Sequence, residues 1–312
     1  MGNKLAGYGI YLPERVVSND ELSRVMDTSD EWISTRTGIK QRHWARHDEA
    51  VADMALAAAL EALENSRLEP GDLDMIICAN CTAELQFPSV AAMTHGRLGC
   101  PPSVAAFDVR GACTGAIYAL HAARAFFEAE MHRRIMVIGA EKLSKMVDLG
   151  DRNTAVLFGD GAGAMIFEAC VESGGGILDT AVFADGKFAD ILCATGDGKI
   201  RMNGPELYKK AVVCMPEAAA ELLKRNGLGA GDIDWVVPHQ ANIRIMQSAA
   251  ERLGIDGDRL IATVGQHANT SAASGLLAMG AAISGGKMKR GDLAIYPAFG
   301  SGLTWGAALI RI

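Results

Sequence analysis

An internal repeat constrains the fold of this chain more than any other feature of its sequence. Residues 59–77, ALEALENSRLEPGDLDMII, align without gaps onto residues 219–237, AAELLKRNGLGAGDIDWVV, at an offset of 160, and seven of the nineteen positions are identical. Both copies read as a helix, a Gly-Asp turn and a short apolar strand. We therefore predict two copies of one α/β unit, residues 1–170 and 171–312, whose sheets are covered by helices and pack side by side.

A second match between the two halves is a turn that carries a cysteine in only one of them. Residues 112–115, Ala-Cys-Thr-Gly, align with residues 272–275, Ala-Ala-Ser-Gly, at the same offset, and an apolar helix follows each turn. At the start of a buried helix, unpaired backbone N–H groups and the helix dipole favour a thiolate at Cys113. A small buried cysteine is the alternative interpretation. Because Ala273 aligns with Cys113, the asymmetry favours a nucleophile over a packing residue.

Two polar clusters in the second half are candidates to work with Cys113. His239 follows an apolar stretch that ends at Pro238, and Asn269 precedes the second apolar helix. Because the two halves are equivalent, the ends of their strands should converge near Cys113. A single histidine or asparagine after a strand is usually a loop or capping residue. Two such clusters and a cysteine at a helix start, all placed by one duplication, instead favour a composite site.

Composition excludes several classes of protein. The chain has 312 residues, of which 49% are hydrophobic and 21% charged, and this is typical of a globular protein with room for two domains. A net charge of −7 argues against a general nucleic-acid or membrane-surface binder. Seven cysteines, an odd number, do not suggest a disulfide framework. With no signal-peptide pattern and no uninterrupted apolar stretch of membrane-spanning length, we expect a cytoplasmic protein.

Short motifs run in a fixed order along nearly the whole chain. They lie at residues 30–33, 36–39, 87–89, 112–115, 151–152, 158–163, 238–242, 269–274 and 298–306. With these motifs the chain resembles a β-ketoacyl-acyl-carrier-protein synthase III, a condensing enzyme of the thiolase superfamily that starts fatty-acid synthesis. The resemblance implies a thiolase-like fold, in which two duplicated α/β halves form a layered αβαβα core.

The resemblance also implies a catalytic triad of Cys113, His239 and Asn269. Cys113 would attack the thioester of a short acyl-CoA starter, acetyl-CoA first among them, and hold the acyl group covalently. Backbone N–H groups of Cys113 and Ser301 would form the oxyanion hole. Malonyl-carrier protein would then lose CO₂, and His239 and Asn269 would stabilise the resulting enolate before it attacks the acyl-cysteine. This chemistry requires no metal and no redox cofactor.

Three further groups of residues carry over from the family pattern. Acyl-CoA would be bound by Thr28, Trp32, Arg36, Arg152 and Asn242. The acyl pocket would be lined by Leu143, Phe158 and Leu192, together with Phe87 of the partner subunit in a homodimer. The acidic acyl carrier protein would dock against Lys209, Arg244 and Arg252.

Five positions depart from the usual family pattern. They are Pro205, Tyr208, Glu251, Ala268 and Ser301. Pro205 stands where an asparagine amide is common, and Glu251 stands where a carrier-docking helix often has a basic residue. These departures leave the reaction class intact and bear on the choice of starter and the strength of carrier docking.

Other readings of the chain remain open. A specialised relative that primes secondary-metabolite, biotin-type or quinolone-type synthesis would share these motifs, and plant-type polyketide synthases share the triad. A non-catalytic protein that binds acyl-CoA or the carrier would keep the fold alone, and the intact triad argues against it. Cys78 and Cys81 fit a C-x-x-C pattern, but without a second pair or a histidine cluster we predict neither a metal nor a redox role.

Overall fold

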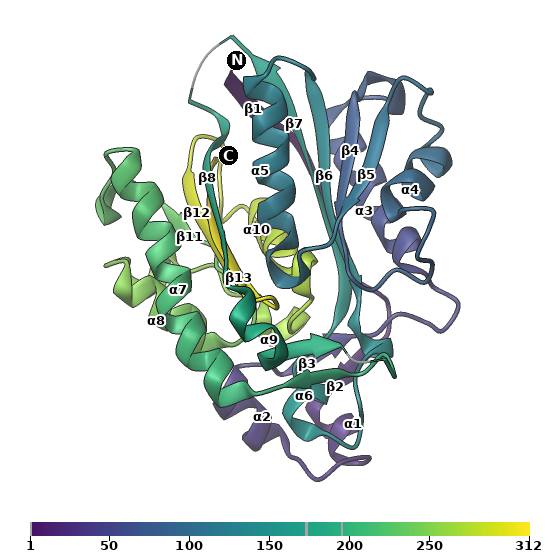
Figure 1. Cartoon of the computed structure of the whole chain (residues 1–312), viewed down its shortest axis with the longest axis vertical. Coiled ribbons are helices and arrows are strands. Elements are labelled where there is room, and N and C mark those ends of the chain that lie inside the picture. The colour runs from purple at the N-terminus through teal and green to yellow at the C-terminus, as the bar shows by residue number, and fades with distance from the viewer. Residues whose placement is uncertain (1, 172–173, 195) are drawn as a thin grey trace.

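The computed structural model describes residues 2–171, 174–194 and 196–312. Two sheets dominate it (Figure 1). The first sheet has the order β1 (Gly2–Tyr11), β7 (Asp160–Cys170), β6 (Arg134–Lys142), β4 (Met75–Ala79) and β5 (Ala105–Val109). The second has the order β11 (Trp235–Val236), β12 (Leu293–Gly300), β13 (Thr304–Arg311) and β8 (Gly176–Ala184). In the first sheet β4 is parallel to β5 and β6, and in the second β11 is parallel to β12; the other neighbouring strands of both sheets are antiparallel.

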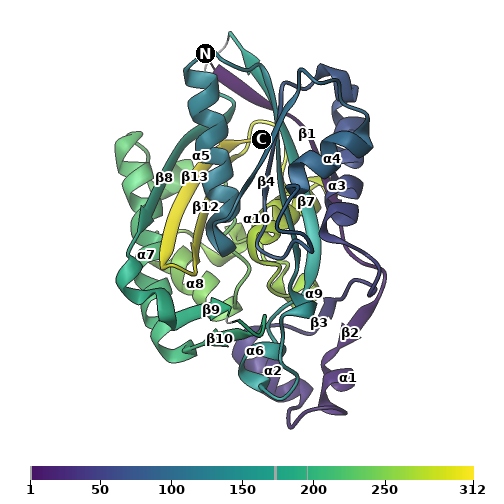
Figure 2. The same ribbon diagram turned by 45° about the vertical axis from the view of Figure 1, so that its right-hand side comes forward.

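Helices lie on both sides of each sheet. The helix pair α5 (Gly115–Glu128) and α10 (Ser274–Ser284) stands between the two sheets, as the turned view in Figure 2 makes clear for α5. Helices α3 (Val51–Ser66) and α4 (Val90–Leu98) cover the outer face of the first sheet, and α7 (Gly204–Arg225) covers that of the second, with α8 (Ile243–Arg252) packed against it. The predicted layered αβαβα arrangement of the thiolase-like fold is confirmed.

The remaining described elements are short. They are the strand pairs β2 (Val16–Ser18) with β3 (Gln41–His43) and β9 (Leu192–Ala194) with β10 (Ile200–Met202), the helices α1 (Asn19–Ser23), α2 (Asp30–Thr37), α6 (Arg152–Ala155) and α9 (Val264–His267), and the 3₁₀ turns η1 (Pro70–Asp72), η2 (Ala112–Thr114), η3 (Leu143–Lys145), η4 (Gly186–Ile191), η5 (Ala230–Asp232), η6 (Gly257–Arg259) and η7 (Ser271–Ala273).

The repeated helix-turn-strand segment owes its shape to two pairs of identical aspartates. The carboxylates of Asp72 and Asp232 accept hydrogen bonds from the backbone three residues earlier, at 2.9 and 2.8 Å, and fix the turns η1 and η5. Asp74 and Asp234 then accept from backbone N–H groups of the neighbouring strand, β6 and β12 respectively, and each also donates its own N–H to that strand at 2.9 Å. The identities in the repeat are therefore the residues that hold the turn and seat the next strand.

The alignment of the two nucleophile-type turns is corrected by one residue. Turn η2 begins at Ala112 and η7 begins at Ser271, and both residues have a positive φ, 46° and 48°. The 3₁₀ hydrogen bonds Thr114 N–H to Gly111 O and Ala273 N–H to Thr270 O show the same offset of 159. The structural counterpart of Cys113 is thus Ala272 and not Ala273. Both are alanine, so the asymmetry between the halves stands.

Glycine permits the central helices to sit directly on the first sheet. A Cβ atom on Gly139 of β6 would lie 2.5 Å from the carbonyl oxygen of Ala272, and one on Gly163 of β7 would lie 2.7 Å from the backbone nitrogen of Leu277. Apolar residues of α5 and α10 fill the space between the sheets and are almost completely buried. This close approach places the turns η2 and η7 against each other at the centre of the molecule.

Candidate active site

Cys113 lies where two cavities meet. It occupies η2 between β5 and α5, and the residue is only 6% exposed. A cavity of about 880 Å³ opens on one side of it and a smaller one of about 390 Å³ on the other. Both cavities are lined by Cys113, Phe158 and Leu192. A group bound covalently to this sulfur can therefore occupy the smaller cavity while its donor occupies the larger one.

The protonation state of Cys113 differs from the expectation based on the helix dipole. Burial is the largest cause that raises the pKa of the thiol to about 12; the Ser271 side chain acts against it, and the nearby Glu141 carboxylate acts with it. Removal from water outweighs the helix N-terminus here because the charged form of the group loses nearly all its solvation. Burial therefore opposes the thiolate that was expected at the helix N-terminus and favours the thiol form of Cys113 in the free protein.

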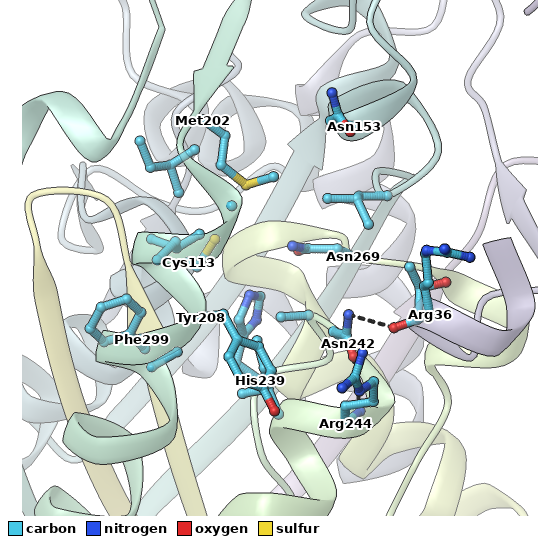
Figure 3. Close-up of a pocket in the computed structure, with 18 of the residues that line it drawn as sticks. Arg36, Cys113, Asn153, Met202, Tyr208, His239, Asn242, Arg244, Asn269 and Phe299 are labelled. Atoms are coloured by element: carbon cyan, nitrogen blue, oxygen red, sulfur yellow. Dashed lines mark hydrogen bonds between the residues drawn. The ribbon is translucent and has the colours of Figure 1, made fainter. Parts of the chain in front are cut away.

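His239 reaches the larger cavity from the end of β11. Its backbone N–H donates to Pro297 O at 2.9 Å, which ties the residue to β12. The ring Nδ1 lies 2.6 Å from the Ser274 hydroxyl, so Nε2 is the nitrogen left for a ligand (Figure 3). Burial lowers the pKa of the ring to about 4. The imidazole is therefore neutral near pH 7 and can donate one hydrogen bond through Nε2.

Asn269 is oriented by the turn that follows it. Its backbone joins the segment before β7, since Asn269 N–H donates to Leu157 O at 2.9 Å and Asn269 O accepts from Gly159 N–H at 3.0 Å. The side-chain Oδ1 accepts from Ser271 N–H at 2.9 Å. This bond leaves the Nδ2 amide group as a donor toward the larger cavity, beside His239 and Cys113 (Figure 3).

The loop between β12 and β13 presses against the nucleophile. A Cβ atom on Gly300 would lie 3.1 Å from both Cβ and the backbone nitrogen of Cys113. The next residue, Ser301, lines the smaller cavity with Cys113, and its hydroxyl donates to Leu192 O. The loop is therefore in the place that an oxyanion hole requires, and the role of the Ser301 N–H stays a prediction.

The residues expected to bind CoA gather around one tryptophan. The guanidinium groups of Arg36 and Arg152 lie 4.7 and 5.0 Å from the centroid of the Trp32 ring. Asn242 Nδ2 donates to Arg36 O at 3.0 Å. The larger cavity is lined by Trp32 and Arg36 of α2 and by Asn242, the N-cap residue of α8. Thr28 precedes α2, and its buried Oγ1 makes no hydrogen bond within the described part of the chain. Trp32 and Arg36 thus line the cavity, and the Arg152 guanidinium lies against the same tryptophan ring.

The residues expected in the acyl pocket are divided between a cavity and the surface. Leu143, Phe158 and Leu192 line the smaller cavity. Phe87 is 83% exposed on the loop before α4, so its contribution to a partner subunit stays a prediction. Sequence reasoning missed other residues that line this cavity: Cys81, Arg110, Met146, Cys193 and Ile200.

The expected docking residues lie on two neighbouring helices. Lys209 of α7 and Arg244 and Arg252 of α8 are exposed. Arg244 stands at the larger cavity, with its guanidinium 5.8 Å from the centroid of the Tyr208 ring. Pro205 occupies the first turn of α7 and also lines that cavity, so it is placed where an amide donor would face a ligand.

Three polar residues around the nucleophile were not predicted. Ser274 holds the His239 ring, Ser271 holds the Asn269 amide, and Glu141 lies fully buried behind both turns. A charged residue that ends the apolar stretch 135–140 was the available sequence signal for Glu141. In the described residues no group of three or more His, Cys, Asp or Glu side chains is arranged to hold a metal ion, and no described helix is long and apolar enough to cross a membrane.

Comparisons with known proteins agree with this geometry. Residues 107–186 match the family model for 3-oxoacyl-[acyl-carrier-protein] synthase III, and residues 223–312 match the model for its C-terminal part. A β-ketoacyl-[acyl-carrier-protein] synthase III of Cereibacter sphaeroides is 45% identical over 98% of this chain and 97% of its own. The chain belongs to the β-ketoacyl-acyl-carrier-protein synthase III family.

Solved structures extend the comparison to the whole fold of this chain. The crystal structure of 3-oxoacyl-[acyl-carrier-protein] synthase III from Aquifex aeolicus aligns with this chain over the full length of both, with a TM-score of 0.97 and 45% sequence identity. The priming β-ketosynthase from the R1128 polyketide pathway covers all of this chain and 96% of its own, with a TM-score of 0.94 and 31% identity. As a member of this family, the chain is an acyltransferase of the condensing type.

Proposed function

We propose that this protein condenses a short acyl-CoA starter, acetyl-CoA first among them, with malonyl-carrier protein and so initiates fatty-acid biosynthesis. The observation that supports this most is the position of Cys113 at the junction of two cavities, beside a neutral imidazole and an oriented carboxamide. The larger cavity would admit the pantetheine arm of each substrate in turn, and the smaller cavity would hold the acyl group.

In the first half-reaction Cys113 Sγ attacks the carbonyl carbon of the acyl-CoA thioester. The oxyanion that forms would accept hydrogen bonds from the backbone N–H groups of Cys113 and Ser301. Collapse of this intermediate expels CoA and leaves an acyl-Cys113 thioester, which divides a difficult condensation into two easier steps. Trp32, Arg36, Arg152, Asn242 and Thr28 would hold the CoA during this step.

In the second half-reaction malonyl-carrier protein loses CO₂ inside the same cavity. Negative charge develops on its thioester oxygen, and His239 Nε2 and Asn269 Nδ2 would donate hydrogen bonds to that oxygen. Both donors are preorganised, because Ser274 and Ser271 already occupy the other polar atom of each side chain. The carbanion carbon then attacks the acyl-Cys113 carbonyl, which releases the cysteine and gives the 3-ketoacyl product on the carrier.

The remaining properties are proposals on the same basis. The partners would be acyl-CoA, acyl carrier protein and a second copy of this chain, whose Phe87 would close the acyl pocket. The enzyme would act in the cytoplasm, with no nucleic acid or membrane as partner and with no metal or redox cofactor in the reaction.

Mass spectrometry after incubation with a panel of short acyl-CoAs tests the proposal. We expect one acyl mass per chain, located on Cys113, and much slower acylation of Cys113→Ser because a neutral hydroxyl is a weaker nucleophile. Acylation that persists in Cys113→Ala, or that maps to Cys78 or Cys81, would contradict the assignment.

The same experiment distinguishes the proposed function from the alternative functions of related proteins. The higher identity to the Cereibacter and Aquifex synthases than to the R1128 priming enzyme favours a short starter for primary fatty-acid synthesis. A specialised secondary-metabolite, biotin-type or quinolone-type enzyme would select another acyl-CoA from the panel. A non-catalytic acyl-CoA-binding or carrier-binding protein would remain unmodified.

A further inference from the structure

A buried carboxyl group lies behind the nucleophile and has no part in the two half-reactions above. Glu141 near the end of β6 is 0% exposed. Its Oε2 accepts hydrogen bonds from Cys81 N–H at 3.1 Å and from the Thr82 hydroxyl at 2.5 Å. Its Oε1 is buried and accepts no hydrogen bond from the described residues. One oxygen of this carboxyl is therefore fixed, and the other is available.

Ser271 stands between this carboxyl and Cys113. The two turns η2 and η7 pack against each other, and η7 also packs against β6. Ser271 lines the smaller cavity together with Cys113, Cys81 and Thr82. Its side chain interacts with both groups, since it lowers the pKa of the Cys113 thiol and that of the Glu141 carboxyl. The backbone of Ser271 is anchored separately by its N–H bond to Asn269.

The acid–base properties of the site single out Glu141 as a proton acceptor. Acylation requires a base because Cys113 is a thiol with a pKa near 12. The His239 ring is a weak base, with a pKa of about 4. Burial raises the pKa of Glu141 to about 7, so near neutral pH it is a much stronger base than His239 and is still partly ionised.

We propose that Glu141 takes up the proton of the Cys113 thiol through the Ser271 hydroxyl while Cys113 attacks the starter thioester. The thiol proton moves to Ser271 Oγ as the Ser271 hydroxyl proton moves to Glu141 Oε1. The sulfur forms its bond to the acyl carbon, and the C–S bond to CoA then breaks. Glu141 returns the proton through Ser271 to the departing CoA thiolate, so the net change is the transfer of one acyl group and one proton.

The groups around Glu141 leave it as the titrating member of this path. Cys78 and Cys81, on and after β4, face it with pKa values that burial raises, and Cys113 faces it from η2. On its own strand, Lys142 directs Nζ away, to the carbonyl oxygens of residues 46, 47 and 49. The buried Tyr296 hydroxyl of β12 interacts with Cys113 and has its pKa raised above the neutral range.

The inference rests on the proposed function. It is tested by rapid mixing with acetyl-CoA at a series of pH values around 7, with acylation measured by intact mass spectrometry. The wild-type rate should rise with pH through about 7, because Glu141 must be ionised to accept the proton. Glu141→Gln should lose that inflection and acylate about 10²-fold more slowly or worse, as should Ser271→Ala. Glu141→Asp keeps a carboxylate and should retain the inflection.

Alkylation of Cys113 by iodoacetamide supplies a readout of opposite sign. Loss of the Glu141 charge lowers the Cys113 pKa, so Glu141→Gln should be alkylated at least as fast as wild type while being acylated more slowly. Acylation that is unchanged or faster in Glu141→Gln overturns the relay. Equal slowing of acylation and alkylation also overturns it, because it would show that Glu141 only holds Cys113 in place. If Glu141→Gln does not fold, Ser271→Ala decides by its pH profile: loss of the inflection near pH 7 supports the relay, and an inflection that remains overturns it. A wild-type protein that acetyl-CoA and the other short acyl-CoAs leave unmodified on Cys113 would instead refute the proposed function.

Discussion

At His239 and Asn269, one polar atom of each side chain is bound by the protein and the other is left for a ligand. Ser274 binds His239 Nδ1, and the Ser271 N–H binds Asn269 Oδ1. Both anchors belong to the turn and helix that follow Asn269, so one short segment orients both donors. Donors fixed in advance need no reorganisation when charge develops, and this is the main source of electrostatic stabilisation in enzyme sites.

The two half-reactions should respond differently when these donors are removed. His239→Ala and Asn269→Ala should still accept the acyl group on Cys113 but decarboxylate malonyl-carrier protein about 10²–10³-fold more slowly, since each removes one donor to the enolate oxygen. Quenched mass spectrometry measures acylation, and release of labelled CO₂ measures decarboxylation. A variant that condensed at the wild-type rate but failed to acylate would contradict the enolate role.

His239 should also make the folded protein sensitive to acid. Its pKa falls from the ordinary 6.5 to about 4 in the folded state, so below pH 6.5 the unfolded chain binds the proton more readily. The contribution of this group to the free energy of unfolding is fully present above pH 6.5 and is lost as pH falls toward 4. The loss amounts to about 2 kcal/mol at pH 5. Urea unfolding at pH 7 and pH 5 measures this difference, and His239→Gln should lose less stability than wild type over the same interval. Equal losses would show that the ring is not buried as a neutral group.

At the scale of elements, the sequence predicted most where local hydrogen bonds define the structure. The helix-turn-strand repeat was recognisable because Asp72, Asp74 and their counterparts carry out the same backbone capping in both halves. The nucleophile turn was placed one residue out of register, because the loops between the repeat and the turn differ in length, and over residues 112–115 the offset of 160 gives two identities while the structural offset of 159 gives none. Glu141 and Ser271 were missed because their proximity depends on the packing of η7 against β6, which no local pattern specifies.

The close approach of helix and sheet yields a stability prediction with an internal control. Gly139→Ala would place a Cβ atom 2.5 Å from a backbone oxygen that cannot move aside, so unfolding free energy should fall by about 1–3 kcal/mol. Gly96 lies within α4, and a Cβ atom there meets nothing within 4 Å. Gly96→Ala should therefore raise stability by about 0.5–1 kcal/mol. Equilibrium urea unfolding measures both changes, and equal effects from the two substitutions would contradict the packing of η7 on β6.

At the scale of the whole molecule, the site is built between the two halves. Cys113 comes from the first half, His239 and Asn269 come from the second, and the larger cavity is also lined by α2, α7 and α8. The duplication was sufficient to predict that these residues converge. It could not predict the two cavity volumes or the presence of Arg110 and Cys193 in the smaller one, because these depend on side chains from distant segments packing in three dimensions.

Carrier docking is a property of the whole surface, because a chain with a net charge of −7 must receive an acidic partner. Among the exposed cations of α7 and α8, Arg244 lines the larger cavity, and local attraction there would have to overcome the long-range repulsion. Lys209 is exposed and does not line the cavity itself, so Lys209→Glu should weaken use of malonyl-carrier protein several-fold and leave self-acylation by acyl-CoA unchanged. Arg244→Glu should do the same to carrier use.

Glu251 provides the matched change of opposite sign. It lies exposed on α8 beside Arg252, so Glu251→Lys should strengthen use of the carrier if α8 is the docking helix. The wild-type rate with malonyl-carrier protein should fall as salt is added, because exposed charges are screened beyond about 8–10 Å at physiological ionic strength. Steady-state condensation rates over a salt series, with self-acylation measured in parallel, test these effects. A reaction insensitive to salt, with Lys209→Glu and Glu251→Lys both neutral, would place the docking surface elsewhere on the molecule.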